Sequence, residues 1–346
     1  MTDERNRWLD IVKGLTIFLM ILGHCIQNGN GAAYISSQAF WSDKVTIFIY
    51  SFHMPLFMLI SGYFLHYSLK KRPLVKALRN KINHLLYPII IFNLYNYIIG
   101  NTAYIDNLFY IIINLNDLAF KIFDGYWFLW AVLIFSILVT LVHFLLKDNL
   151  VIYIVIFFLL FFIPNFIFNL QTFRIDFMYP FFIIGYLFPK WEFKLTRPLL
   201  IWFLVCAIFA IQLYLFDEKD YIYASGLNIL HSKLGLSVLE QIKINLFRIS
   251  IGISGSLFFL ISVYYAYHQF FKLERLWKIF SYIGVNSLLI YCLQEILITF
   301  LIRSYAKNFE LSYFNNLLQT FFTLFCCFII IEILKRNELL RKLHLD

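Results

Sequence analysis

The composition of this 346-residue chain excludes a soluble globular protein. Hydrophobic residues make up 61% of it and charged residues only 14%, and Phe and Tyr occur 41 and 23 times. Soluble domains carry about a quarter charged residues to cover their surface. The formal net charge of +9 does not indicate nucleic-acid binding, because the basic residues are scattered over predicted loops and no nucleic-acid-binding motif occurs. We therefore expect a polytopic membrane protein.

Long apolar segments predict an all-α polytopic membrane helix bundle with about ten transmembrane helices. A helix needs about 20 apolar residues to cross a hydrocarbon core of about 30 Å. The segments comprise residues 9–27, 44–66, 84–100, 126–146, 150–169, 175–189, 198–216, 244–267, 279–302 and 314–334. Residues 1–346 are expected to form a single integral membrane domain, with no appended soluble domain. Because no metal-ligand spacing occurs among the cysteines and histidines, no metal is expected.

Lys and Arg residues predict the orientation of the bundle. Short cytoplasmic loops carry an excess of these residues, and here the loops on the side of the N-terminus contain about twice as many as the opposite loops. Both termini are therefore expected in the cytoplasm. The start of the chain resembles a signal peptide, but Asp10 and Lys13 interrupt its apolar run and no cleavage site follows. We interpret it as a retained first helix.

The first predicted span contains three ionisable residues, Asp10, Lys13 and His24. On a helix they lie within roughly 40° of one line, with about 16 Å between Lys13 and His24 along the axis. An intramembrane charge costs about 2.5–3.5 kcal/mol even on mild scales, so such residues usually face a polar cavity. They predict a functional site. The simpler alternatives are that Asp10 and Lys13 snorkel or pair near the inner headgroups, and that His24 is a core histidine with satisfied hydrogen bonds.

The second predicted span adds His53 and Pro55. His53 lies about 13 Å below the outer boundary, and His24, approaching from the cytoplasmic side, comes within about 10 Å of it. We therefore expect the two histidines to meet in the outer half of the membrane. Pro55 frees a backbone carbonyl one turn earlier, while Ser61 and Gly62 permit a neighbouring helix to pack closely.

Several short segments, spread over most of the chain, carry motifs that occur together in one protein family. They are Trp8-Leu9-Asp10-x-x-Lys13-Gly14 with Gly23-His24, Phe52-His53-Met54-Pro55-Leu56-Phe57 with Ser61-Gly62, Tyr126-Trp127-Phe128-Leu129-Trp130-Ala131, Pro180-Phe181-Phe182-Ile183-Ile184-Gly185-Tyr186, and Ser287-Leu288-Leu289-Ile290-Tyr291. In these segments the chain resembles the membrane-bound acyltransferase family 3, the bacterial glycan O-acetyltransferases that modify capsule and other cell-surface polysaccharides.

Two positions depart from the family pattern. Where the family has a His shortly after the Ile-Tyr pair of its ninth helix, this chain has Gln294, so a side chain that can change its charge becomes a neutral amide. Where the family has Arg-x-x-Arg before Leu-Leu-x-Pro, this chain has Lys81 and His84. Cationic character is therefore only partly kept.

The resemblance implies an O-acyltransferase, in the first place an O-acetyltransferase, in the bacterial plasma (inner) membrane, with acetyl-CoA as acyl donor and a glycan hydroxyl as acceptor. A neutral imidazole can remove the hydroxyl proton near pH 7, which makes His24 the expected general base, with His53 either as its partner or as the residue that orients the acceptor. The expected catalytic residues are His24, His53 and Asp10; those expected to bind the donor are Lys13, Arg72, Arg79, Lys81 and His84; and those expected to bind the acceptor are Tyr126, Trp127, Trp130, Gln294 and Glu295.

Simpler interpretations stay open for part of this set. The basic segment from Lys70 to Lys81 could serve only as a topology determinant, and Tyr126, Trp127 and Trp130 could belong only to the aromatic belt. The main alternative function is a flippase or exporter of lipid-linked polysaccharide, in which buried charges line a conduit. A membrane sensor is a further alternative. The expected partners are acyl-CoA, the glycan acceptor and the lipid bilayer, but no nucleic acid; an oligomer is compatible with the sequence.

Overall fold

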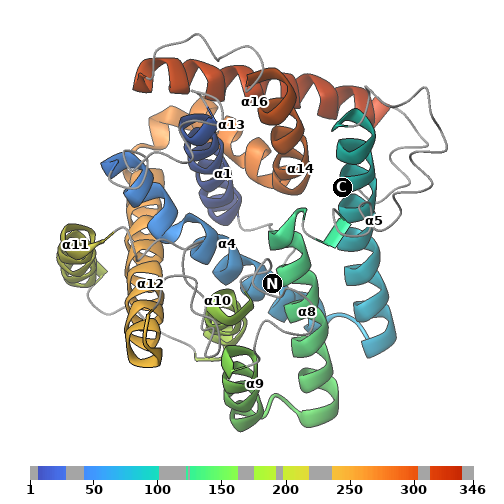
Figure 1. The fold of residues 1–346 in the computed structure, drawn as a ribbon, viewed down its shortest axis with the longest axis vertical. Coiled ribbons are helices and arrows are strands. Elements are labelled where there is room, and N and C mark those ends of the chain that lie inside the picture. Colours follow the sequence, from blue (N-terminus) through green and yellow to red (C-terminus); the bar gives the residue numbers. More distant parts are fainter. Residues whose placement is uncertain are drawn as a thin grey trace.

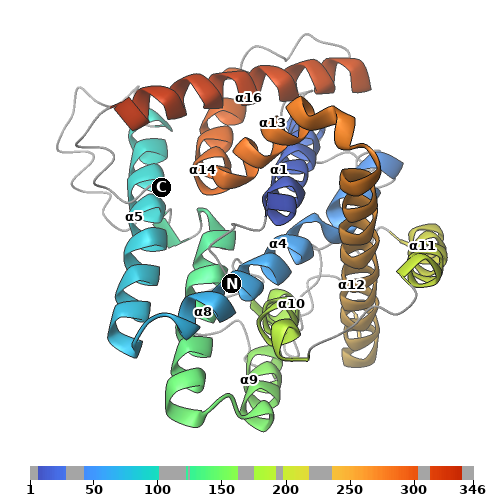
Figure 2. The ribbon, with the colours of Figure 1, turned by 180° about the vertical axis from the view of Figure 1, so that it is seen from behind.

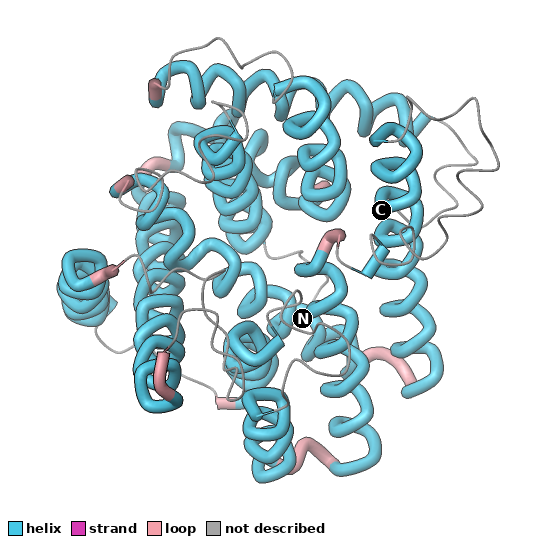
Figure 3. The backbone as a smooth tube through the Cα atoms, in the orientation of Figure 1, coloured by secondary structure: helices cyan, strands magenta, loops and turns pink. Residues whose placement is uncertain are grey.

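The fold is taken from a computed structural model that describes residues 7–28, 43–100, 122–123, 125–162, 175–191, 198–217, 236–302 and 312–336. Within these ranges the chain forms helices and no strand (Figure 3). The α-helices are α1 (Arg7–Asn28), α4 (Lys44–Lys70), α5 (Leu74–Gly100), α8 (Trp127–Leu146), α9 (Leu150–Phe162), α10 (Ile175–Leu187), α11 (Pro198–Leu215), α12 (Val238–Gln269), α13 (Glu274–Val285), α14 (Ser287–Leu297) and α16 (Tyr313–Arg336). Short 3-10 turns follow α10 and α12, and a π-helix, Ile298–Ile302, follows α14.

The lengths and apolarity of these helices make the chain a membrane protein. Among the described residues, α1, α4, α5, α8, α12 and α16 are each long and apolar enough to cross a bilayer, and α13 with α14 forms a seventh, bent candidate. The helices α9 and α11 are apolar but shorter. Each of the ten segments predicted from the sequence overlaps one or more of the described helices, although residues 163–169 of the fifth lie outside the described ranges. The prediction of an all-α membrane bundle is confirmed, whereas the count of about ten spans stays a prediction.

Helix α4 occupies the centre of the bundle. It crosses the middle of the molecule in both views (Figures 1 and 2) and packs against α10, α12 and α1. Helix α1 packs in turn against α13 and α16, and α5 packs against α8. Helix α11 lies at the periphery, against α12. The two segments with the predicted functional histidines, α1 and α4, are thus neighbours in the interior.

Two pairs of glycines bring helix backbones into direct contact. A Cβ atom on Gly14 would lie 1.9 Å from the carbonyl oxygen of Phe280, and one on Gly284 would lie 1.8 Å from that of Asp10. Gly62 of α4 and Gly185 of α10 form the equivalent contact between those helices, with the nearest carbonyl oxygens at 2.0 and 1.9 Å. Membrane helices associate through such close packing rather than through the hydrophobic effect. The packing role predicted for Gly62 is therefore confirmed.

The ninth predicted segment, residues 279–302, is not a straight span. Helices α13 and α14 meet at an angle of 80°, and Asn286 lies at the break. Its side-chain amide donates to the carbonyl oxygen of Tyr282 at 2.8 Å, and its backbone N–H donates to the same oxygen at 3.2 Å, so this acceptor at the end of α13 has partners inside the bundle. The break turns α14, which carries Gln294 and Glu295, toward α1 and α5.

The basic segment predicted as a loop, Lys70 to Lys81, is mostly helical. Only Lys71 to Pro73 separate α4 from α5, which begins at Leu74. Helix α5 thus begins ten residues before the predicted apolar segment, because positions 76, 79 and 81 are charged but helical. Helical periodicity places Lys81 and His84 on one face, since residues three apart are neighbours, while Arg79 points to the surface.

Candidate functional site

One face of α1 forms a wall of a cavity inside the bundle. Lys13, Ile17 and Met20 line this cavity, and His24 follows one helical turn beyond Met20 on the same face. Lys13 and His24 therefore lie at two depths along one stripe, as their spacing predicts. Lys13 is near the start of α1 and His24 near its end.

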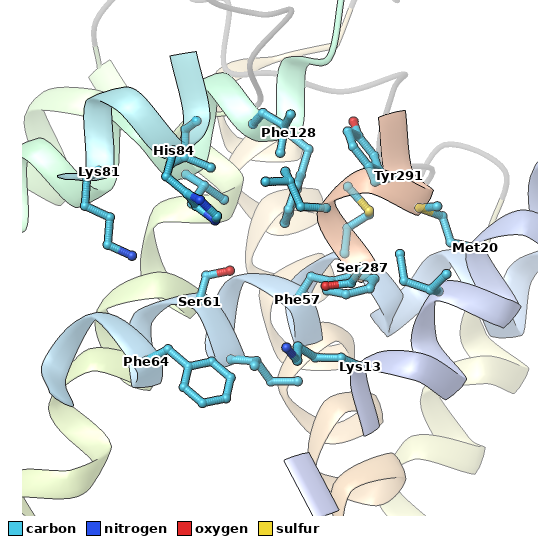
Figure 4. A pocket seen from close by; sticks show the side chains of 17 residues that line it. Lys13, Met20, Phe57, Ser61, Phe64, Lys81, His84, Phe128, Ser287 and Tyr291 are labelled. Carbon is cyan, nitrogen blue, oxygen red and sulfur yellow. The ribbon is translucent and has the colours of Figure 1, made fainter. Parts of the chain in front are cut away.

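The cavity encloses about 190 Å³ among α1, α4, α5, α8 and α14. In Figure 4 the ammonium groups of Lys13 and Lys81 both point into it, and the hydroxyl group of Ser61 lies between them. The rest of the wall is apolar. Its polar side chains are Lys13, Ser61, Lys81, His84, Ser287 and Tyr291.

Positive charge predominates at this end of the cavity. Lys13 forms an ion pair with the buried Asp10 at 3.0 Å and also lies 5.2 Å from the centre of the Phe64 ring. The local pairing predicted as an alternative for Asp10 and Lys13 is therefore present, in addition to the contact of Lys13 with the cavity. The ion pairs formed within the described part of the chain include none to Lys81. With His84 close by, this end suits an anionic ligand.

His24 lies against α14, where it meets the residue that departs from the family pattern. Its Nδ1 atom is 3.0 Å from Oε1 of Gln294 and 4.0 Å from a carboxylate oxygen of Glu295. Gln294 is fully buried, whereas the Glu295 side chain is half exposed. The amide nitrogen of Gln294 donates to the carbonyl oxygen of Tyr291 at 3.3 Å. Gln294 thus connects His24 to a residue of the cavity wall.

His53 approaches the same region from α4. It is 1% exposed, and its Nδ1 atom donates to the carbonyl oxygen of Ile49 at 2.7 Å, because a carbonyl can only accept. Its ring packs edge-on against Tyr50, with the ring centroids 5.0 Å apart. The approach of α4 to α1 is tight here: a Cβ atom on Gly23 would lie 2.9 Å from the Tyr50 ring.

The three aromatic residues predicted to bind the acceptor occupy different environments. Tyr126 is 6% exposed, and its hydroxyl donates to the carbonyl oxygen of Cys292 at 3.0 Å and accepts from Asn96 at 3.1 Å. Its ring therefore faces protein and supports α14. Trp127 and Trp130 are half-buried, so the prediction of sugar stacking depends on these two rings.

The two arginines predicted to bind the donor lie outside the cavity. Arg72 and Arg79 are both exposed, and Arg72 donates to the Ser68 hydroxyl at 3.3 Å. The structure thus brings Lys13, Lys81 and His84 together and leaves the arginines on the adjoining surface. Ser61, predicted only as a packing residue, also lines the cavity.

A second polar cluster, which sequence reasoning missed, joins the α8–α9 turn to α10. We call it the Asp148 cluster; its members are His143, Asp148, Tyr153, Tyr186 and Lys190. Asp148 has a left-handed backbone conformation with φ 58°. Burial raises the pKa of its carboxyl, but hydrogen bonds from the other four members outweigh burial and hold the pKa at about 2. No periodic pattern could have revealed this cluster, because the turn brings its members together.

The candidate site contains no metal centre in the part of the chain that the structure describes, where no group of three His, Cys, Asp or Glu side chains could hold an ion.

The chain matches one protein family over nearly its whole length. Residues 6–335 match the model of the family described as acyltransferase domain, the acyltransferase 3 family. The chain belongs to this family. This membership agrees with the resemblance of the individual motifs.

The chain is also similar to two curated relatives. The chain is 29% identical over 198 residues to nodulation protein NolL of Sinorhizobium fredii, covering 54% of this chain and 50% of that protein. It is 29% identical over 189 residues to nodulation protein NolL of Mesorhizobium japonicum, covering 55% of this chain and 49% of that protein. The chain thus spans about half the length of the curated relatives it matches. No solved structure matches it.

Proposed function

We propose that the protein transfers an acetyl group from acetyl-CoA, bound from the cytoplasmic side, to a hydroxyl group of a cell-surface or lipid-linked glycan. The observation that carries the proposal is the single α1 face on which a cavity-lining cation, Lys13, and the imidazole of His24 lie about 16 Å apart. A donor with phosphates at one end and a thioester at the other, joined by a long flexible arm, suits this separation.

The cationic end of the cavity would hold the donor. Lys13, Lys81 and His84 supply charge inside the cavity, and Arg72 and Arg79 supply it on the surface nearby. Lys13 and Lys81 both lie toward the helix starts that the predicted topology places in the cytoplasm. The cavity volume of about 190 Å³ is below the roughly 300–1,000 Å³ of pockets that enclose drug-sized ligands. It therefore favours the acetyl thioester and part of the arm over a long acyl chain or the entire donor.

The imidazole of His24 would act as general base. Its nitrogen takes the proton of the acceptor hydroxyl while the oxygen bonds to the thioester carbonyl carbon, the carbon–sulfur bond breaks, and the proton passes on to the leaving thiolate. The products are the glycan ester and free coenzyme A. His53, whose Nδ1 proton is committed to its own helix, presents its other nitrogen as an acceptor that could orient the hydroxyl. Trp127 and Trp130 would provide rings on which the acceptor sugar stacks.

The test is His24→Ala in the producing cells, with His268→Ala as a matched control because His268 is exposed and outside the cavity. Surface glycan and its ester content are measured in the same cells. We expect His24→Ala to leave a normal amount of polymer that lacks the esters, with normal protein accumulation, and the control to match the wild type. Missing surface polymer with glycan retained inside the cell would support the exporter instead. Normal ester content in a well-expressed His24→Ala strain would refute the proposed role of His24.

A further inference from the structure

Gln294 and Glu295, predicted from the sequence to bind the acceptor, contact the proposed base. The Gln294 side chain is fully buried beneath His24, with its orientation fixed by two acceptors. Its nitrogen faces the carbonyl oxygen of Tyr291 at 3.3 Å and a carboxylate oxygen of Glu295 at 3.5 Å. An amide nitrogen only donates, so the amide oxygen must be the atom that faces His24 at 3.0 Å.

This orientation selects one tautomer of His24. An amide oxygen can only accept, and Nδ1 of His24 therefore carries the proton in the neutral imidazole. The lone pair needed for proton abstraction then belongs to Nε2. We infer that Gln294 is a positioning residue, which sets the tautomer of His24 for catalysis, and that Glu295 stabilises the imidazolium formed when the base takes a proton. This inference rests on the proposed function.

The two residues differ in the size of the effect expected. The contact of Gln294 is a direct hydrogen bond in a buried site, where polar interactions are strong. Glu295 is 4.0 Å from Nδ1 and its side chain is half exposed, so solvent screens its charge. Among the described residues, the titratable groups near this region include Tyr50 of α4, whose ring lies against Gly23 and packs on His53, and Tyr126, whose hydroxyl bonds to the carbonyl oxygen of Cys292 in α14. None of them replaces the acceptor that Gln294 offers to Nδ1.

Two substitutions at position 294 separate tautomer control from packing. Gln294→Met keeps the length and volume of the side chain but removes the acceptor. We expect it to lower kcat by about 10- to 100-fold, with little change in KM for acetyl-CoA, because the donor binds elsewhere. Gln294→Glu keeps the acceptor and adds a negative charge. It should retain activity but move the acid limb of the pH profile of kcat/KM up by about 1 pH unit or more, because the carboxylate favours the protonated, inactive imidazole.

Gln241→Leu is the matched control, since Gln241 is another buried amide, on α12, outside the cavity. It should change neither the pH profile nor kcat per folded molecule. Glu295→Gln should move the acid limb down by less than 1 pH unit, because the charge it removes is screened.

The experiment distinguishes failure of this inference from failure of the proposed function. Wild-type kcat in Gln294→Met, or a wild-type pH profile in a folded and active Gln294→Glu enzyme, would overturn the role of Gln294. If His24→Ala is inactive at the same time, the proposed base stands and only the positioning role falls. If His24→Ala is active, the proposed function loses its base as well.

Discussion

The polar side chains of the Asp148 cluster and those around His24 differ in how their hydrogen-bonding groups are paired. In the Asp148 cluster, four donors surround one carboxylate: His143 and Tyr153 at 2.6 Å, Tyr186 at 2.9 Å, and Lys190. Around His24, Gln294 contacts one ring nitrogen, Nδ1, at 3.0 Å, and the same helix face continues into a cavity. Mutually satisfied polar groups stabilise a fold, whereas polar groups at a cavity edge can act on a ligand.

Apart from substitution of His24, the largest expected effect on the kinetics comes from removing a cationic side chain of the cavity. Lys81→Ala should raise KM for acetyl-CoA about tenfold or more, because a charge-assisted hydrogen bond is worth about 1.5–3 kcal/mol. Lys76→Ala is the matched control: Lys76 is exposed on the same helix and does not line the cavity. Steady-state kinetics with purified protein measure both. Equal KM values for the two variants would remove Lys81 from the donor site.

Lys13 should behave differently from Lys81 because it lies on the stripe that leads to the base. Lys13→Ala also leaves the buried Asp10 without the ammonium group that pairs with it at 3.0 Å. We expect a decrease in kcat as well as a higher KM, if Lys13 orients the donor along the cavity. A kcat equal to that of the wild type would limit Lys13 to its ion pair with Asp10.

The Asp148 cluster should affect stability rather than chemistry. Because the folded protein holds the pKa of Asp148 at about 2, below its ordinary value of 3.8, the carboxylate stabilises the fold above about pH 4, and this contribution is lost as the pH falls toward 2. Asp148→Asn should therefore melt at a lower temperature than the wild type at pH 7, and the difference should shrink on acidification. Melting curves in detergent measure it. A difference independent of pH would contradict this role, as would a large loss of kcat per folded molecule.

The smallest expected effect on activity comes from removing the hydrogen bond by which Tyr126 holds α14. Tyr126→Phe removes the hydrogen bond from Tyr126 to the carbonyl oxygen of Cys292, two residues before Gln294. Such a bond contributes about 0.5–1.5 kcal/mol, so we expect a decrease in kcat of a few-fold and an unchanged KM for acetyl-CoA. An increase in KM for the glycan acceptor alone would favour a direct contact of Tyr126 with the sugar.

The sequence predicted the membrane class, the helix segments and the stripe of Lys13 and His24, because hydropathy and helical periodicity are local properties. It did not predict the 80° break at Asn286, because the apolar segment continues through it without a Pro or Gly at that position. It assigned Gln294 to the acceptor and could not predict its contact with His24, since the two residues are 270 positions apart. The Asp148 cluster escaped detection for a related reason: a left-handed turn and a contact between distant helices create it.

The central claim is that one membrane protein moves the acetyl group and that His24 removes the acceptor proton. The most direct measurement incubates purified protein with acetyl-CoA and cell glycan, and follows the thiol released and the ester formed in the same sample. The account predicts equal amounts of thiol and ester with the wild type, and a decrease in both by at least about 100-fold with folded His24→Ala. Ester formation at the wild-type rate by His24→Ala, or no glycan-dependent thiol release by the wild type, would contradict it.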